Sequence, residues 1–229
     1  MRSTTVKAGV LASLLTLTLA ACGSNAEDVA DAPAAAASEA VNEATTEPKV
    51  LAEIPALKGV STAVTLDPEF LSGVTSLGLT PGLVGATTLE GAVLTFPITG
   101  GAVTLYEQGT TGDKPFIEGV IEHEGNGLTL TGGGKVVELK NFDVDAGESE
   151  LRTDISVDGA EFGKDVETFF LDGSTLTYPP TMEGTNAILE GTTVSLTKGA
   201  ADALNKVFGT TALTEFFPVG VAKITAATS

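Results

Sequence analysis

The feature that most constrains this chain is an alternation of apolar and polar residues between positions 93 and 157, interrupted by glycine-rich segments. A period of two places the apolar side chains on one face of a β-strand. Gly-Gly and Asn-Gly pairs accept the positive φ angles of tight hairpin turns. We therefore expect an antiparallel meander, with turns at Gly100-Gly101, at residues 124–127 and at residues 132–134.

Further strands are expected at residues 151–157, 167–171, 176–178 and 188–196. About ten short strands with no helical repeat between them favour a mainly β fold over any α/β fold. The expected fold is thus an antiparallel β-sandwich or barrel-like meander.

Two short helices interrupt the strands, each with a cap, an apolar stripe and a glycine stop. Asp67 and Pro68 begin the first helix before Gly78, and Thr197 begins the second before Gly209. An apolar strand containing proline follows each helix. This order suggests an internal duplication, although such common local patterns also coincide by chance. We expect the two helices to close the open ends of the β core.

The first 21 residues are typical of a secretion signal, with a basic start, a short apolar run and small residues before Cys22. The apolar run is too short to span a bilayer comfortably. The segment Leu19-Ala20-Ala21-Cys22 resembles the lipobox of bacterial lipoproteins, which implies cleavage before Cys22 and lipidation of its sulfur. An ordinary signal peptide with an incidental cysteine is the alternative.

Residues 22–49 are rich in alanine and polar residues and have almost no large apolar side chains. Such a segment cannot bury enough surface to offset its ordering entropy, so we expect a disordered tether. Residues 50–229 then form a single β-rich domain. The expected location is the extracytoplasmic face of the cell membrane, with inner and outer membranes both left open by Gly23.

Charge and cysteine content exclude several classes of function. The formal charge is -18, from 30 acidic and 12 basic residues, which argues against binding to nucleic acid. The single cysteine excludes disulfides within the chain, four-cysteine zinc sites and iron-sulfur clusters.

The segments Phe96-Pro-Ile-Thr-Gly-Gly101 and Ile121-Glu-His123-Glu-Gly125 resemble those of secreted actinobacterial β-domains, including the HtaA-type haem-uptake domain. In haem-binding members a tyrosine coordinates the iron and a histidine hydrogen-bonds that tyrosine. The resemblance implies a two-sheet fold, with His123 as the matching histidine. Tyr106 and Tyr178 are the only tyrosines that could partner it.

Strand periodicity places His123 on the same face as Ile117 and Ile121, at the end of an apolar stripe. A hydrogen-bonded structural histidine is the simpler interpretation of this position, and ligand binding is the alternative. Tyr106 and Tyr178 are likewise common as amphipathic strand residues.

The alternating oxygens of Asp143, Asp145 and Glu148 weakly resemble a calcium loop, but the glycine and the final glutamate of that loop are not at the required spacing. An acidic hairpin end is the alternative. No nucleophile elbow or distinct carboxylate pair stands out, so an enzyme is not expected; a carboxylate-dependent hydrolase is the third hypothesis.

The sequence therefore predicts a lipid-anchored extracytoplasmic protein that acts by binding an unknown ligand or protein, or as a surface structural module. Its leading alternative is an HtaA-like haem-binding domain. No cofactor is required, although haem or calcium would fit the hypotheses above.

Overall fold

A computed structural model describes residues 47–112 and 115–227 of the chain. These residues belong to one compact unit, Thr45–Ser229. The signal at residues 1–21, Cys22 and nearly all of the tether lie outside the described residues, so the predictions about them remain predictions. Contacts of the domain already include Lys49, whose ammonium group pairs with Glu107 and whose carbonyl accepts from the Glu107 N–H at 2.8 Å.

The described residues form thirteen strands, two α-helices and one short 3₁₀ helix, which confirms the mainly antiparallel β fold. The elements are β1 (Val50–Ile54), β2 (Lys58–Leu66), α1 (Pro68–Ser76), β3 (Thr80–Val84), β4 (Thr88–Glu90), β5 (Val93–Pro97), β6 (Gly100–Tyr106), β7 (Ile117–Gly132), β8 (Lys135–Asp145), β9 (Glu150–Val157), β10 (Ala160–Asp172), η1 (Gly173–Thr175), β11 (Thr181–Glu183), β12 (Asn186–Leu196), α2 (Lys198–Phe208) and β13 (Pro218–Ala227).

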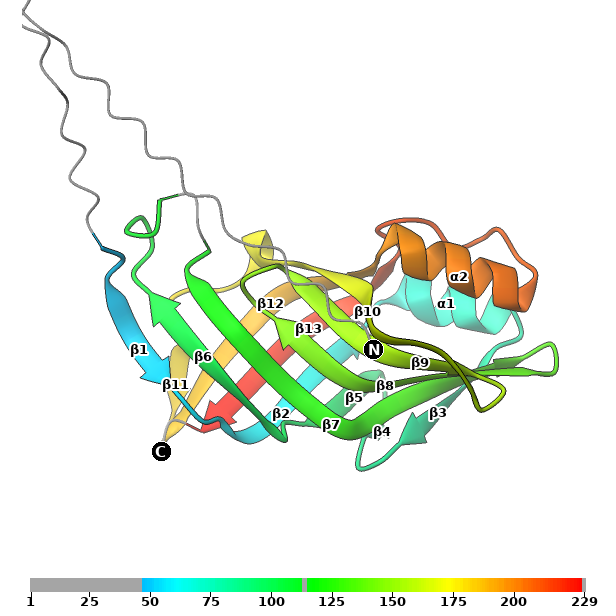
Figure 1. Ribbon diagram of the computed structural model, residues 1–229, viewed down its shortest axis with the longest axis horizontal. Coiled ribbons are helices and arrows are strands. Elements are labelled where there is room, and N and C mark those ends of the chain that lie inside the picture. Colours follow the sequence, from blue (N-terminus) through cyan, green and yellow to red (C-terminus); the bar gives the residue numbers. More distant parts are fainter. Residues whose placement is uncertain (1–46, 113–114, 228–229) are drawn as a thin grey trace, which may run out of the picture. The chain divides into compact units, whose positions relative to one another are not determined.

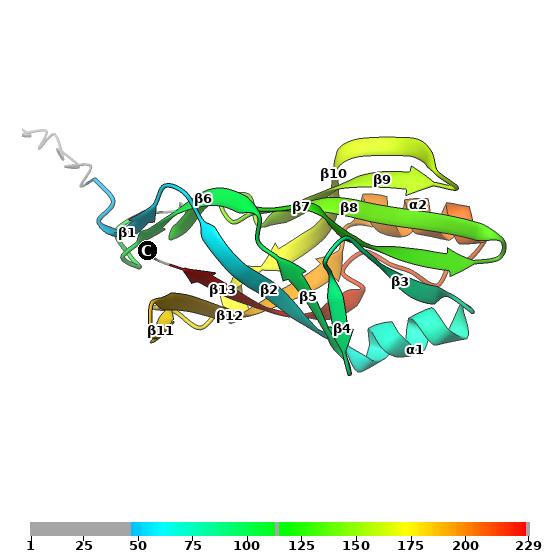
Figure 2. The same ribbon diagram turned by 90° about the horizontal axis from the view of Figure 1, so that it is seen from below.

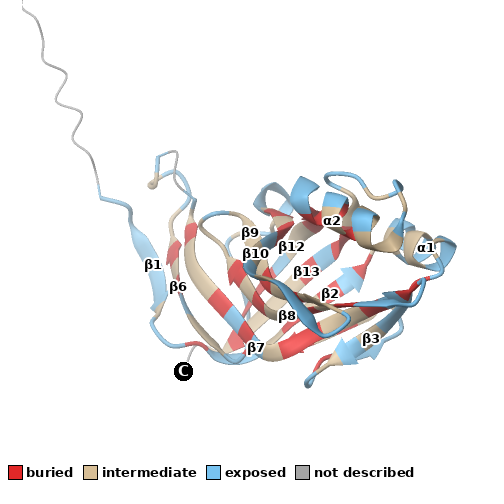
Figure 3. Cartoon of the chain, turned by 45° about the vertical axis from the view of Figure 1, so that its right-hand side comes forward, coloured by how far each residue is buried: buried red, intermediate tan, exposed pale blue. Residues whose placement is uncertain are grey.

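The strands form one strongly curled sheet in the order β1-β6-β7-β8-β9-β10-β12-β13-β2-β5-β4, with β11 on β12 and β3 on β7. The layer that contains β6, β7 and β8 lies across the layer that contains β12, β13 and β2 (Figures 1 and 2). Buried residues lie on strands of both layers, whereas β1 and β3 are mostly exposed (Figure 3). One hydrophobic core thus lies between two layers of the same sheet.

The expected turn at Gly100-Gly101 is wrong. Gly100 and Gly101 are the first residues of β6, and β5 and β6 are not paired with each other. The chain instead crosses from one layer to the other at Ile98 and Thr99. Gly101 has a φ of 112° and lies against the Val120 carbonyl, so a side chain at this position would collide with β7. The glycine pair at this position allows β6 and β7 to approach closely and does not form a hairpin turn.

The expected turn at residues 124–127 is also wrong, because β7 continues through it as a single strand of 16 residues. Its register with β8 shifts between His123 and Gly127, which is a β-bulge. Shifts of the same kind follow in β8 after Lys140 and in β10 after Gly163, where Asn141 and Asp165 have positive φ angles of 54° and 50°. The bulges on neighbouring strands bend the sheet. The turn at residues 132–134 is confirmed, since it joins β7 to β8.

Both helices begin and end as predicted. The Asp67 side chain accepts a hydrogen bond from the Glu69 N–H at the start of α1, and Thr197 does so from Ala200 at the start of α2. Gly209 ends α2 with a φ of 66°. The helices do not close opposite ends, however: they lie side by side at the same end of the sheet (Figures 1 and 2), where residues of both line one small cavity.

The segments around the two helices are only partly alike, because β3 and β4 lie between α1 and β5 whereas β13 follows α2 directly. The strand before α1, β2, pairs with β5, and the strand before α2, β12, pairs with β13.

The expected strand at residues 176–178 is wrong, because η1 and a loop occupy that region. Within the described residues, no helix has the length and apolar character needed to cross a membrane.

Candidate functional site

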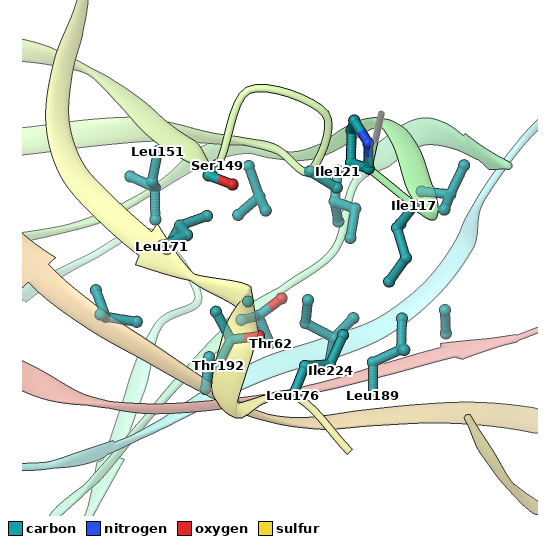
Figure 4. A pocket seen from close by; sticks show the side chains of 18 of the residues that line it. Thr62, Ile117, Ile121, Ser149, Leu151, Leu171, Leu176, Leu189, Thr192 and Ile224 are labelled. Atoms are coloured by element: carbon teal, nitrogen blue, oxygen red, sulfur yellow. The ribbon is translucent and has the colours of Figure 1, made fainter. Parts of the chain in front are cut away.

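A cavity of about 360 Å³, here called the main cavity, lies between the two layers. In Figure 4, Ile117, Ile121, Ser149 and Leu151 form one wall, and Thr62, Thr192, Ile224 and Leu189 face them from the other. Its other lining residues are mainly aliphatic and come from strands distant in sequence: Ile54, Leu57, Val64, Val103, Leu105, Val144, Leu171, Leu176, Val194, Ala222 and Ala226. Such a cavity can hold an apolar small molecule, since ligand sites are usually concave and mostly apolar.

Few polar side chains line the main cavity. Thr62 and Thr192 are on strands, Ser149 precedes β9, and Asp172 and Ser174 lie at the 3₁₀ turn. The Ser174 N–H donates to the Asp172 carboxylate at 2.9 Å, and hydrogen bonding from Ser174 lowers the pKa of Asp172. Asp172 is the one carboxylate in this lining, so the pair of carboxylates required by the hydrolase hypothesis is not present there.

His123 joins the two layers of the sheet. Its ring is 1% exposed; Nδ1 lies 2.8 Å from the Phe142 carbonyl oxygen, and Nε2 lies 2.8 Å from Thr62 Oγ1. Phe96 packs edge-on against the imidazole at 6.3 Å between ring centroids. Burial lowers the pKa of His123, so the ring is neutral at pH 7. The face predicted for His123 is confirmed, and both ring nitrogens are occupied by protein partners.

Tyr106 and Tyr178 lie together, away from His123. The Tyr178 hydroxyl donates to the Tyr106 carbonyl oxygen, and the Tyr106 hydroxyl donates to the Glu118 carboxylate at 3.2 Å. Loss of hydration, and then the neighbouring Glu118, raise the pKa of the Tyr106 phenol. The Tyr178 ring packs against Phe116, which lines the main cavity. The structure therefore brings the two tyrosines together but pairs neither of them with His123.

Haem does not fit the residues as they are arranged here. Haem iron is held in proteins by histidine, cysteine, methionine or tyrosine, and none of these residue types lines the main cavity. His123 borders only a smaller space of about 50 Å³ beyond Thr62. Coordination by a phenol would require Tyr106 or Tyr178 to leave its present hydrogen bond.

The three candidate calcium residues do not converge. Asp143 and Asp145 lie within β8, and Asp145 accepts hydrogen bonds from the N–H groups of Gly147 and Glu148 at the turn into β9. Burial, followed by repulsion from Glu122, raises the pKa of Asp143 to about 6. Nowhere in residues 47–112 and 115–227 do three histidine, cysteine or acidic side chains come together in a way that could hold a metal ion.

Fold and site together define a two-layered antiparallel β-domain with an apolar cavity between its layers. Among solved structures, the chain is similar to the C-terminal domain of HtaA from Corynebacterium glutamicum, with a TM-score of 0.51 and 14% identity over 76% of this chain and 98% of that domain. It also matches the haem-binding protein HtaB from the same organism, with a TM-score of 0.45 and 10% identity over 77% of this chain and 96% of that one. No family model and no curated protein matches the sequence. The similarity to HtaA extends to the fold alone.

Thr62 and the rest of the cavity lining were missed by the sequence analysis. The only available signal was the alternation of small polar and apolar residues at positions 58–66, which shows that Thr62, Val64 and Leu66 share a face. Nothing local indicates that this face borders a cavity, because the opposite wall comes from strands far away in the sequence.

Proposed function

We propose that this protein is a non-enzymatic binding protein, anchored through a lipid on Cys22 at the extracytoplasmic face of the membrane, and that its β-domain holds a small apolar molecule in the main cavity. The volume of about 360 Å³ between the layers, with its mostly apolar lining, carries this proposal. Burial of apolar ligand surface supplies about 25 cal/mol per Å², so an aliphatic chain is the ligand that such walls favour.

The test uses the mature chain, residues 22–229, with Cys22→Ala so that it carries no lipid and needs no detergent. Diphenylhexatriene, an apolar probe without hydrogen-bonding groups, should bind with saturable fluorescence. Ala222 lines the cavity from β13, whereas its neighbour Val221 is exposed. Ala222→Phe should abolish the signal and Val221→Phe should retain it. Equal binding by both variants would overturn the proposal.

The anchor is tested separately. The lipobox supports lipidation of Cys22, so the wild-type chain should be recovered with membranes and the Cys22→Ala chain should be released from them. Equal recovery of both chains in the membrane fraction would contradict anchoring through Cys22.

Haem binding is the second candidate, favoured by the similarity to the HtaA domain. Haem added to the mature chain separates the two candidates. On the apolar-ligand proposal no coordinated Soret band develops. A saturable Soret shift that is lost in Tyr106→Phe, Tyr178→Phe or His123→Ala would favour haem instead.

A further inference from the structure

The His123–Thr62 hydrogen bond determines which polar group the main cavity presents to a ligand. The Phe142 carbonyl oxygen can only accept, so the imidazole must donate to it from Nδ1. A neutral imidazole carries one proton, and burial keeps this ring neutral at pH 7. Nε2 therefore carries no proton and can only accept.

It follows that Thr62 donates its hydroxyl hydrogen to His123 Nε2 across the 2.8 Å contact. A hydroxyl group has one donor and two acceptor positions, so only acceptor positions remain at Thr62 Oγ1. Thr62 lines the main cavity and also borders the small space beside His123, which places it between the two. His123 thus turns the Thr62 hydroxyl into an acceptor set in an apolar wall.

We propose that the main cavity takes an apolar molecule carrying a hydrogen-bond donor, a hydroxyl or an N–H, and that Thr62 Oγ1 accepts this hydrogen bond. The proposal rests on the binding function above and names its ligand class. A long-chain alcohol meets the requirement, whereas an alkane or an ether of the same length does not. Thr62 is the specificity-determining residue and His123 is a positioning residue, since His123 acts on the ligand only through Thr62.

The binding test compares decanol with its methyl ether as displacers of diphenylhexatriene from the mature chain with Cys22→Ala. For each chain, the dissociation constant of the methyl ether is divided by that of decanol. Dividing this ratio for the unaltered cavity by the ratio for Thr62→Val cancels the difference in hydration between the two displacers. One net hydrogen bond predicts a preference for decanol of roughly fivefold by this measure. Thr62→Ser should keep the preference because it keeps the hydroxyl.

Thr192→Val is the matched control, because Thr192 is a second threonine on the same wall (Figure 4). It should leave the preference for decanol unchanged. A preference that survives Thr62→Val, or that is lost equally in Thr192→Val, overturns the proposal. Both displacers could bind the unaltered cavity with no greater preference for decanol than in Thr62→Val. In that case the proposed ligand class is wrong, but the binding of apolar molecules stands. If the probe itself does not bind, the proposed function fails first.

A second measurement tests the premise without any ligand and without a cavity variant. The chain contains one histidine, so nitrogen-15 labelling of histidine gives a single imidazole spectrum. We expect a proton on Nδ1 and none on Nε2. A proton on Nε2 would make Thr62 the acceptor in its contact with His123 and would overturn the proposal even if Thr62→Val fails to fold.

Discussion

At the residue scale, His123 is a structural link, because its ring forms hydrogen bonds to both Thr62 and Phe142. Replacing it by phenylalanine keeps an aromatic ring of similar volume but leaves the Thr62 hydroxyl and the Phe142 carbonyl without their partner. Each unpaired buried polar group costs about 1–3 kcal/mol. We therefore expect His123→Phe to lower the free energy of unfolding by roughly 2–6 kcal/mol in urea denaturation. A loss below about 0.5 kcal/mol would show that the link is not structural.

The same histidine affects the pH dependence of stability. Its folded-state pKa lies below the unfolded value of 6.5, so the unfolded chain binds more protons between the two values. Stability from neutral His123 is therefore complete above 6.5 and is lost as the pH falls below it. Urea titrations at several pH values should show this loss in wild type and a smaller one in His123→Phe.

Asp143 has the opposite effect on the pH dependence of stability. Its folded-state pKa of about 6 exceeds the ordinary value of 3.8, so the folded chain binds more protons between these limits. Ionisation of Asp143 thus destabilises the fold as the pH rises from about 4 to above 6. Asp143→Asn should stabilise the protein at pH 7.5 by roughly 1 kcal/mol, because partial exposure weakens the effect, and by almost nothing at pH 4. Equal stabilisation at both pH values would contradict this origin.

At the element scale, the bulges in β7, β8 and β10 are the features that shape the sheet. Asn141 lies at the centre of them with a φ of 54°; its Oδ1 accepts from the Gly125 N–H at 2.8 Å, and its Nδ2 donates to Asp154 at 2.9 Å. Asparagine tolerates this left-handed backbone better than most residues, and its side chain ties neighbouring strands together.

Two substitutions of Asn141 separate backbone strain from side-chain bonding. Asn141→Gly loses only the hydrogen bonds, which predicts a loss of roughly 1–2 kcal/mol in the free energy of unfolding. Asn141→Ala loses the same bonds and adds left-handed strain, which predicts about 1 kcal/mol more. Thermal or urea denaturation checks the order. An alanine variant as stable as the glycine variant would exclude strain at this position.

Local signals predicted those elements whose cause is local. Both helices follow from a capping side chain, an apolar stripe and a stop, all within about a dozen residues. The face of His123 follows from the period of two. The segment Gly125-Asn126-Gly127 was misjudged because the residues that suit a tight turn also suit a bulge. What decides between them is pairing with β8, where Asn141 supplies the partner to Gly125.

At the scale of the whole molecule, the curled sheet creates the cavity that carries the proposed function. Its walls combine β6, β7 and β8 with β12, β13 and β2, and Thr62 and His123 meet although they are 61 residues apart. Sequence patterns predicted the antiparallel fold class and one member of this contact. They could not predict the site. A cavity forms where side chains from strands that are distant in sequence do not fill the space between the layers, and no local pattern shows this.

On the proposed function, an apolar molecule occupies this cavity in the cell. The most direct test of this occupancy is mass spectrometry of the organic extract of the mature chain with Cys22→Ala, exported and purified without detergent. We expect one class of small apolar molecule bearing a hydroxyl or N–H donor, present near one per chain, lost in Ala222→Phe and retained in Val221→Phe. An extract with no such molecule, or one equally abundant in both variants, would contradict the proposed occupancy.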